Sequence, residues 1–458
     1  MSHPSVILHL GLGSFHRAHQ AVYLQALHDL GDASWVLAGA NIRADMQAVE
    51  AALIAQNGVY HVETVTPAGV RAYQEIRSIR HVIPWEEGLA GLIAYGARPE
   101  VKIISFTVTE AGYYLTPQHK LDLNFPDLVS DLEQGTMLTI YGALTAILHA
   151  RMAAGSGKVT LLSCDNLRSN GERFHEGFAE FLYRRGDEQL LSWLKTHTTT
   201  PACMVDRITP RPLPDVAERV RAACGGDDQC PVMGEDFIQW VIEDDFAAGR
   251  PAWEKVGAAL VASVQPYEEA KIRLLNAQHS TIAWAGTLAG YLFIHEGTLD
   301  KDVRGFAYDY VTNDVLPVLE PSPINLAAYR DKVLERFSNA YIRDTNQRVA
   351  ADGYSKIPGW VTPTIRQRFA AGEGIESVAM IPALFFLFLQ EWAAGKLPFE
   401  YQDQAMDEAA VRAMLEGPMP LLAFCRDTVL FGDLAGDARL EAAIGRAHER
   451  ALAWRASR

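Results

Sequence analysis

Val6-Ile-Leu-His-Leu10, followed by Gly11-Leu-Gly13-Ser-Phe-His16, is the stretch that decides the fold of this chain. The apolar run predicts a short buried strand, and the pattern from Arg17 to Leu30 predicts a helix directly after the glycine turn. Glycine permits a tight turn and a close backbone approach, while a helix N-terminus supplies N–H donors for a phosphate. Taken alone, two glycines are equally typical of a structural turn, since His16 replaces the third glycine of G-x-G-x-x-G. At the first strand–helix junction of an α/β chain, they predict a dinucleotide site.

The rest of the first half alternates strands and helices. This alternation predicts an α/β fold with a mainly parallel, doubly wound, Rossmann-like sheet. We expect a β-hairpin inserted in it, and long helices through to the C-terminus. The predicted domains are a Rossmann-like NAD-binding domain, 1–260, and an α-helical substrate and catalytic domain, 261–458. The predicted elements are strands at Val6–Leu10, Trp35–Asn41, Val101–Thr109, Lys158–Ser163 and Ala202–Ile208, helices near 136–153 and 171–196, a hairpin of Tyr60–Val65 with Gly69–Ile79, and helices at Phe306–Val318, Leu326–Phe337, Thr364–Phe369, Ile375–Ala394 and Asp407–Leu415.

The composition is that of a globular enzyme, because 49% of the 458 residues are hydrophobic and 21% are charged. A formal net charge of −15 argues against a nucleic acid or an anionic membrane as partner and favours a small-molecule ligand. The five cysteines form no C-x-x-C pair and are odd in number, which favours the cytoplasm over a disulfide framework. The chain begins in a strand and not in a signal peptide. Its longest apolar stretch, Met380 to Leu389, falls short of the roughly 18 residues of a membrane helix.

A second informative stretch is Tyr267-Glu-Glu-Ala-Lys-Ile-Arg-Leu-Leu-Asn-Ala-Gln-His279, which fixes a base, an amide and an imidazole at short spacing. On an α-helix that turns about 100° per residue, Lys271, Glu268, His279 and Asn276 fall within about 140° and can face one cleft. The ordinary interpretation of such a set is a wet polar stripe on an amphipathic helix. The segment through Ala285 is too apolar for a surface helix, so we expect these polar groups to border a buried cavity.

Other polar residues stand at predicted strand ends, where parallel sheets bind ligands. Asn166 follows one strand and can donate an amide hydrogen bond, although Asp-Asn is also ordinary turn chemistry. Asp45, beyond the second strand, favours NAD, while Arg43 leaves NADP open. His16 and His19 lack the accompanying ligands of a zinc site, so we expect no metal and expect them to cap the helix that binds phosphate. The candidate cofactor residues are Gly11, Gly13, Ser14, Phe15, His16, Arg43, Asp45, Thr107, Thr109 and Glu110.

Six landmarks then occur in one order over nearly the whole chain. They are Gly11-Leu-Gly-Ser-Phe-His-Arg-Ala-His-Gln20, Ser163-Cys-Asp-Asn-Leu167, Val205-Asp-Arg-Ile-Thr-Pro210, Gln239-Trp-Val-Ile-Glu-Asp244, Gly249-Arg-Pro-Ala-Trp-Glu-Lys255 and the Lys271-x4-Asn276-x2-His279 block. In these landmarks the chain resembles the mannitol dehydrogenase family of polyol-specific long-chain dehydrogenases. His16 belongs to that family's own version of the glycine fingerprint.

The resemblance implies a zinc-independent, NAD-dependent oxidation of a secondary alcohol in a linear polyol to a ketose, carried out by a monomer. Carried over by position, Lys271 resembles the general base, and Asn166 and Asn276 resemble the pair that holds the reacting oxygen. His279 resembles a substrate hydroxyl partner, and Glu268 a carboxylate that links the lysine to solvent. Arg348 and Lys356 resemble substrate-binding cations. Asp206 lies on a matching motif, where a substrate contact and a structural tie to Arg207 both remain open.

In length and in its start the chain resembles the members of that family that oxidise D-arabinitol to D-xylulose, which implies D-arabinitol as the substrate, with D-mannitol to D-fructose as the alternative. Reduction of a hexuronate such as fructuronate or tagaturonate is a further alternative, because Arg348 or Lys356 could bind a carboxylate. A noncatalytic dinucleotide-binding sensor is an alternative from another class. The base and the oxyanion pair argue against a sensor, which has no use for them.

Overall fold

The computed structural model of the protein describes residues 4–116, 118–211 and 214–458. The chain divides into two compact units. Unit 1 is Met1–Val65 with Val70–Gln265, and unit 2 is Thr66–Gly69 with Pro266–Arg458. The predicted boundary after residue 260 lies a few residues earlier.

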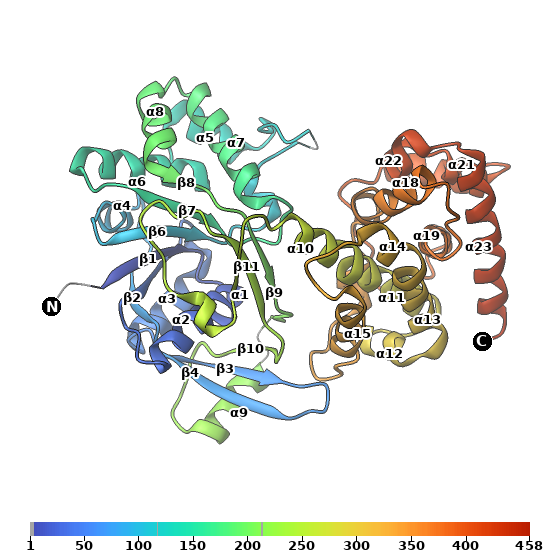
Figure 1. The fold of residues 1–458 in the computed structure, drawn as a ribbon, viewed down its shortest axis with the longest axis horizontal. Helices are drawn as coiled ribbons and strands as arrows, with labels where there is room; N and C mark the ends of the chain where they lie inside the picture. Colours follow the sequence, from blue (N-terminus) through green and yellow to red (C-terminus); the bar gives the residue numbers. More distant parts are fainter. Residues whose placement is uncertain (1–3, 117, 212–213) are drawn as a thin grey trace. The chain divides into compact units, whose positions relative to one another are not determined.

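Unit 1 is built on a six-stranded sheet in which every neighbouring pair is parallel (Figure 1). The prediction of a doubly wound, Rossmann-like sheet is therefore confirmed. This sheet contains four of the predicted strands, those expected at Val6–Leu10, Trp35–Asn41, Val101–Thr109 and Lys158–Ser163. The strand order is β5 (Ile79–Val82), β2 (Trp35–Ala40), β1 (Ser5–Leu10), β6 (Val101–Phe106), β7 (Val159–Ser163) and β8 (Thr198–Thr199).

Both faces of this sheet are covered, which is why its strands are nearly continuous apolar runs. Leu8 and Ile104 belong to a core shared with helices α4 to α8, whereas Ile7 and Ile103 belong to a second core shared with α1 to α3. The helices of unit 1 are α1 (Ser14–Ala18), α2 (Gln20–Asp29), α3 (Gln47–Ala55), α4 (Ala90–Gly96), α5 (Pro126–Gln134), α6 (Ile140–Ala154), α7 (Asn170–Arg184), α8 (Glu188–His197) and α9 (Pro214–Cys224), with 3₁₀ turns η1 (Ala44–Met46), η2 (Glu110–Tyr113) and η3 (Trp253–Val256).

Two predicted helical stretches are interrupted. The helix expected at 17–30 is α1 and α2 with a break at His19, whose φ of −127° and ψ of −85° are not helical. The stretch expected at 171–196 is α7 and α8. Gly186 separates these helices in a left-handed conformation, and the Asp187 carboxylate then caps α8 by accepting from Leu190 N–H at 3.1 Å.

Two three-stranded sheets complete unit 1. The predicted hairpin is confirmed as β3 (Tyr60–Val65) antiparallel to β4 (Arg71–Ile76), and β10 (Val232–Glu235) adds to β3 in parallel. The prediction that 202–208 joins the parallel sheet is wrong. That segment forms β9 (Cys203–Asp206), which pairs antiparallel with β11 (Gln239–Glu243), next to β12 (Ala259–Val261). The sequence pattern of a strand indicates that the strand is buried, but not which strand it pairs with. In this sheet, Trp240 of β11 belongs to the second core.

Unit 2 is helical, as predicted. Its centre is α11 (Ala277–Leu288), which is buried on nearly all sides and packs against α12, α13, α16 and α19. The other helices are α10 (Gln265–Ala270), α12 (Ile294–Leu299), α13 (Lys301–Tyr310), α14 (Leu316–Leu319), α15 (Leu326–Phe337), α16 (Asn346–Ala350), α17 (Gly353–Lys356), α18 (Thr362–Ala370), α19 (Met380–Ala393), α20 (Glu408–Glu416), α21 (Pro420–Cys425), α22 (Thr428–Phe431) and α23 (Ala438–Ala456), with a 3₁₀ turn η7 (Gly432–Leu434).

Three turns of unit 2 are π-helical, with i→i+5 hydrogen bonds: η4 (Lys271–Asn276), η5 (Val311–Val315) and η6 (Ile357–Val361). η4 packs against both η5 and η6. Isolated π turns inside helices occur frequently at functional sites. This cluster of π turns therefore makes the Lys271 segment a candidate functional site.

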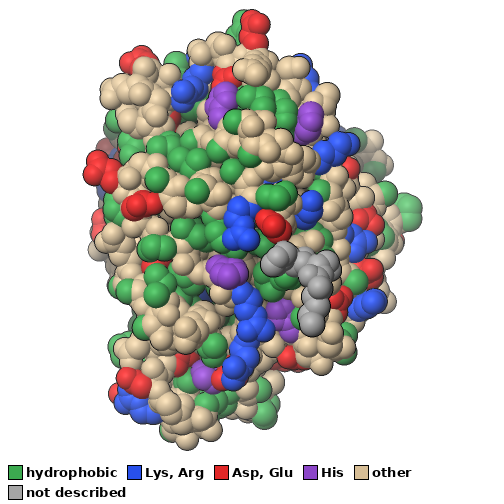
Figure 2. Space-filling view, turned by 90° about the vertical axis from the view of Figure 1, so that its left-hand side faces the viewer, with side chains coloured by type: hydrophobic (Ala, Val, Ile, Leu, Met, Phe, Trp, Pro, Cys, Tyr) green, Lys and Arg blue, Asp and Glu red, His purple; other side chains and the backbone are tan. Residues whose placement is uncertain are grey.

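Within the residues described, no helix is both long and apolar enough to span a membrane. The helix predicted from the apolar stretch at Met380 is buried α19. Figure 2 shows one face of the molecule, where basic side chains near the middle lie beside histidine and acidic side chains. Charges of both signs therefore share this face, although the chain carries a net charge of −15.

Candidate active site

The glycine turn joins β1 to α1, and its two glycines serve different needs. Gly11 has a φ of +109°, and a Cβ there would lie 2.4 Å from the carbonyl oxygen of Thr107. Gly13 has an ordinary φ of −67°, and a Cβ there would meet nothing within 4 Å. The protein's own packing therefore requires glycine at 11 but not at 13, where it leaves open space before Ser14 and Phe15 begin α1.

Asn41 and Arg17 hold this turn in place. Asn41 Oδ1 accepts from Leu12 N–H at 2.8 Å, and its Nδ2 donates to Glu50 at 2.6 Å. Arg17 Nε donates to the Leu12 carbonyl at 3.2 Å, and its guanidinium also donates to the Cys230 carbonyl. Neither residue was among the predicted site residues. In the sequence, Asn41 is distinguished only by its position directly after the second strand, and Arg17 only by its position directly after His16.

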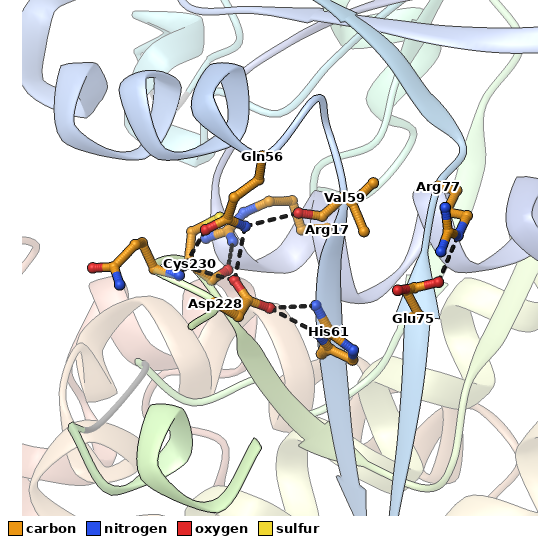
Figure 3. A network of polar contacts seen from close by, with 9 residues as sticks. Arg17, Gln56, Val59, His61, Glu75, Arg77, Asp228 and Cys230 are labelled. Carbon is orange, nitrogen blue, oxygen red and sulfur yellow. Dashed lines mark hydrogen bonds and ion pairs between the residues drawn. The ribbon is translucent and has the colours of Figure 1, made fainter. Parts of the chain in front are cut away.

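Cys230 is itself anchored by a polar network around Asp228 (Figure 3). The Asp228 carboxylate accepts from the main chain of His61 at 2.6 Å and of Cys230 at 3.0 Å, and from the Gln56 amide at 3.0 Å. The network ties the loop before β10 to the start of β3. Through Arg17, the same loop supports the helix that follows the glycine turn.

His16 and His19 lie in a buried polar chain. His16 stacks on His9 with ring centroids 3.4 Å apart, its Nδ1 lies 3.2 Å from Gln20 Oε1, and Gln20 Nε2 contacts His19 Nδ1 at 3.0 Å. The prediction that these histidines cap the helix is wrong, because α1 and α2 have no side-chain cap hydrogen bond. Burial lowers the pKa of His9 to about 3 and that of His16 well below its ordinary value, so both rings are neutral at pH 7.

Several buried polar atoms of unit 1 have no hydrogen-bonding partner among the described residues, and His16 Nε2 and Thr107 Oγ1 are two of them. Both residues adjoin the glycine turn, in sequence or through the Gly11–Thr107 approach. A buried polar atom without a partner is costly, and a ligand that supplies the partner removes the cost. These atoms and the open space at Gly13 fit the phosphate and sugar oxygens of a dinucleotide.

The region beyond β2 holds Arg43 and Asp45. Arg43 Nη2 donates to Asp127 at 2.6 Å and to the Tyr114 hydroxyl at 2.8 Å. Asp45 is exposed in the first turn of η1. The exposed carboxylate can accept hydroxyl hydrogen bonds, whereas Arg43 would have to share its guanidinium with Asp127 to bind a phosphate.

The ends of β6 and β7 lie side by side, because the two strands pair in parallel. They bring the turn of Thr107, Thr109 and Glu110 next to Asp165-Asn166. The Asp165 carboxylate accepts from the N–H groups of Val108 and Thr109, and Glu110 begins η2. In the sequence, Asp165 is distinguished only as the neighbour of Asn166, and no role was predicted for it. Asp206 ends β9 and is buried, while the hydrogen bonds described for Arg207 go to the carbonyls of Ala18 and Glu235.

In unit 2, Glu268 lies at the end of α10, Lys271 to Asn276 form π turn η4, and His279 lies in α11. Ala277 N–H donates to the Ile272 carbonyl, five residues back, where the prediction assumed an α-helix. A π turn rotates less per residue, so Lys271 and Asn276 lie closer to one face than the predicted separation of about 140°. Glu268 and Lys271 are buried, as expected for polar groups at a cavity.

His279 is held by Asp344, a residue that sequence analysis missed. His279 Nε2 lies 3.0 Å from Asp344 Oδ2, although the ring is not oriented for an aligned hydrogen bond, and it stacks on Phe337. Arg348 binds the same carboxylate with two hydrogen bonds, of 2.8 and 2.7 Å. Burial lowers the pKa of His279. Burial raises the pKa of Asp344, but His279 and Arg348 together hold it below its ordinary value.

Lys356 lies at the end of α17, where Nζ donates to the Val349 carbonyl at 2.8 Å. It also lies 5.4 Å from the centroid of the Trp360 ring. Burial lowers its pKa to about 8. Lys356 is therefore still mostly a cation at neutral pH, but one that can lose its proton just above it.

Unit 1 thus offers a glycine turn at the end of the first strand of a parallel sheet, and unit 2 offers a buried lysine with an amide and an imidazole on one helical segment. Together these define a dehydrogenase of the two-unit Rossmann class. The family model for the mannitol dehydrogenase Rossmann domain matches residues 5–255, and that for the mannitol dehydrogenase C-terminal domain matches residues 263–452. The chain belongs to the mannitol dehydrogenase family.

Individual relatives match over nearly the whole chain. D-arabinitol 4-dehydrogenase of Ralstonia nicotianae is 57% identical over 99% of this chain and 98% of its own length. Mannitol 2-dehydrogenase of Cereibacter sphaeroides is 37% identical, with 98% and 94% covered. The solved mannitol 2-dehydrogenase of Pseudomonas fluorescens, a ternary complex with NAD and D-mannitol, is 33% identical with a TM-score of 0.83, covering 97% of this chain and 91% of that chain. The predicted family and fold are confirmed.

Proposed function

We propose that this protein oxidises a secondary alcohol of a linear polyol with NAD, and that D-arabinitol, converted to D-xylulose, is its preferred substrate. The observation that carries this proposal is the 57% identity, over 99% of the chain, to a D-arabinitol 4-dehydrogenase. A substrate pocket is set by many side chains, and the mannitol 2-dehydrogenase of Cereibacter sphaeroides is only 37% identical. The buried Lys271 segment supports the chemistry independently of any name.

The proposed NAD contacts lie in unit 1. NAD supplies the acceptor for the hydride that leaves the carbinol carbon. Gly11 lets the turn approach Thr107 closely, Gly13 leaves open space for the pyrophosphate, Ser14, Phe15 and His16 begin the helix beside it, and Thr107 has an unpaired buried hydroxyl. Exposed Asp45 is proposed to bind the ribose hydroxyls. The engagement of Arg43 with Asp127 supports NAD over NADP.

The proposed general base is Lys271. As the C–H bond breaks and the hydride departs, the hydroxyl must lose its proton, so that polyol and NAD⁺ yield ketose, NADH and H⁺. Lys271 takes that proton as a neutral amine, and burial generally favours the neutral form of a lysine. Buried Glu268, three residues earlier, is proposed to pass the proton on towards solvent.

Neutral amides suit an oxygen that cycles between alcohol and carbonyl. Asn166 and Asn276 are proposed to donate to this oxygen, each worth about 2.7–4 kcal/mol by comparison with other oxyanion holes. His279, which lies against the Asp344 carboxylate, is proposed to bind a neighbouring substrate hydroxyl. Arg348, Lys356 and Asp206 are proposed to bind the hydroxyls of the remaining polyol chain. This set requires no metal, and we propose a zinc-independent enzyme that acts as a cytoplasmic monomer.

The test is the initial rate of NADH formation with D-arabinitol, D-mannitol, D-sorbitol, xylitol and L-arabinitol, with NAD and NADP in parallel. We expect the highest kcat/KM with D-arabinitol and NAD. Two relatives are named mannitol 2-dehydrogenase, so D-mannitol is the main alternative. A higher kcat/KM with D-mannitol would identify it as the preferred substrate instead. Absence of turnover with every polyol would overturn the proposal, and fructuronate and tagaturonate would then be assayed with NADH.

A further inference from the structure

The Asp165 carboxylate is buried beneath the turn that follows β6, with its residue 3% exposed. Its Oδ1 accepts from Thr109 N–H at 2.7 Å and from Val108 N–H at 3.0 Å. Its Oδ2 accepts from the Tyr113 hydroxyl at 2.8 Å. A single side chain thus gathers donors from the turn and from η2, which contains Glu110.

The turn itself is strained. Thr109 has a φ of +64° and a ψ of 166°, a region that is essentially restricted to glycine. Threonine is β-branched, so its backbone does not adopt this conformation by preference. Such a conformation persists only where the surroundings over-determine it. The two N–H groups fixed by Asp165 belong to the peptides on either side of Val108, directly before Thr109, and provide that constraint.

The main chain of Asp165 is fixed from the other side. Asn170 Nδ2 donates to the Asp165 carbonyl at 3.0 Å and to the Cys203 carbonyl at 2.8 Å, and Asn170 Oδ1 accepts from Cys203 N–H at 2.9 Å. The peptide that joins Asp165 to Asn166 is therefore tied to the start of β9. Asp165 therefore determines two positions: its side chain holds the turn after β6, and its main chain holds Asn166.

Ionisation of this carboxylate is costly. Burial raises the pKa of Asp165 to about 6, against the lowering effect of its hydrogen bonds to Val108, Tyr113 and Thr109. At neutral pH the group is charged, so it accepts from all three donors. A neutral amide of the same shape would avoid the cost of burying a charge but would have only one acceptor oxygen. A costly charge beside a strained turn is the pattern of a site shaped for function.

We propose that Asp165 is a positioning residue that holds residues 107–110 in the strained conformation which presents them to the dinucleotide, while its own main chain carries Asn166. The inference rests on the proposed function, because it takes this turn as part of the NAD site. Asp165 itself touches neither substrate nor cofactor in this assignment. It acts through Thr107, Thr109 and Asn166.

The test is Asp165→Asn, read out by NADH affinity, steady-state kinetics and melting temperature. We expect the NADH dissociation constant and the KM for NAD to rise at least tenfold and kcat to fall. The matched control is Asp131→Asn. Asp131 is equally buried and accepts from Leu138 and Thr139 N–H, both at 2.8 Å, beyond the β6 turn. The control should lower the melting temperature and leave NADH affinity within twofold of the wild type.

Glycine at position 109 gives a second, sharper measurement. Glycine adopts positive φ freely, so Thr109→Gly should raise the melting temperature and should restore NADH affinity in the Asp165→Asn background to within threefold of the Thr109→Gly protein. Wild-type NADH affinity in Asp165→Asn, an equal loss in Asp131→Asn, or no restoration by glycine would overturn the proposal. If Asp165→Asn does not fold, a lower melting temperature in Thr109→Gly overturns it. A wild type that binds NADH but oxidises no polyol would contradict the proposed function alone.

Discussion

Lys271 is the residue on which the proposed chemistry depends, and its surroundings explain why. It opens a π turn, and the residues that follow it, Leu274 and Leu275, are buried. A π turn interrupts the regular α-helix and changes the direction of the side chains around it. Such turns occur frequently at functional sites. The turn brings Lys271 and Asn276 towards one face of the segment, which suits a base and an amide that act on the same oxygen.

Replacing Lys271 by alanine is expected to lower kcat with D-arabinitol by about 10²–10⁴-fold, the usual contribution of a general base. NADH affinity should stay within twofold of the wild type, because the proposed cofactor contacts lie in unit 1. Stopped-flow turnover and NADH fluorescence titration measure the two quantities. The control is Lys332→Ala, which removes an exposed lysine paired with Glu335 at 3.1 Å. A large loss of NADH affinity in Lys271→Ala would contradict the assignment.

At the scale of elements, the β1–α1 turn separates a structural glycine from a functional one. Gly11→Ala places a methyl group 2.4 Å from the Thr107 carbonyl at a φ of +109°, so we expect a loss of about 1–3 kcal/mol of stability, measured by urea unfolding. Gly13→Ala meets open space at an ordinary φ, so its stability should match the wild type while its NADH affinity falls at least tenfold. Unchanged NADH affinity in Gly13→Ala would remove the dinucleotide from this turn.

The predictable elements are those whose signal is local. Val6–Leu10, the glycine turn and Leu326–Phe337 follow from periodicity and turn chemistry, and the structure has them. The sheet to which β9 belongs was not predictable, because burial of a strand does not specify which edge it pairs with. The π turn at Lys271 was not predictable either, since a single inserted residue leaves no period to detect.

The candidate site shows the same division. Lys271, Asn276 and His279 stand close together in the sequence, so their spacing within an apolar segment predicted a site. Asp344 contacts His279 from 65 positions further along the chain, and Asp165 supports a turn that begins 58 positions earlier. Such partners are brought together only by the fold. A polar group at an unremarkable position, buried and fully hydrogen-bonded, gives no signal in a single sequence.

At the scale of the whole molecule, unit 1 contains two large cores on the faces of its own sheet and all of the proposed NAD contacts. A fragment of residues 1–265 is larger than the minimum size at which a domain buries enough surface to be stable on its own. We therefore expect this fragment to melt cooperatively by circular dichroism and to bind NADH within tenfold of the full chain. It should not oxidise D-arabinitol, because Lys271 and Asn276 are absent. A fragment that folds but does not bind NADH would show that the cofactor site requires residues of unit 2, and the assignment of its contacts to unit 1 would fail.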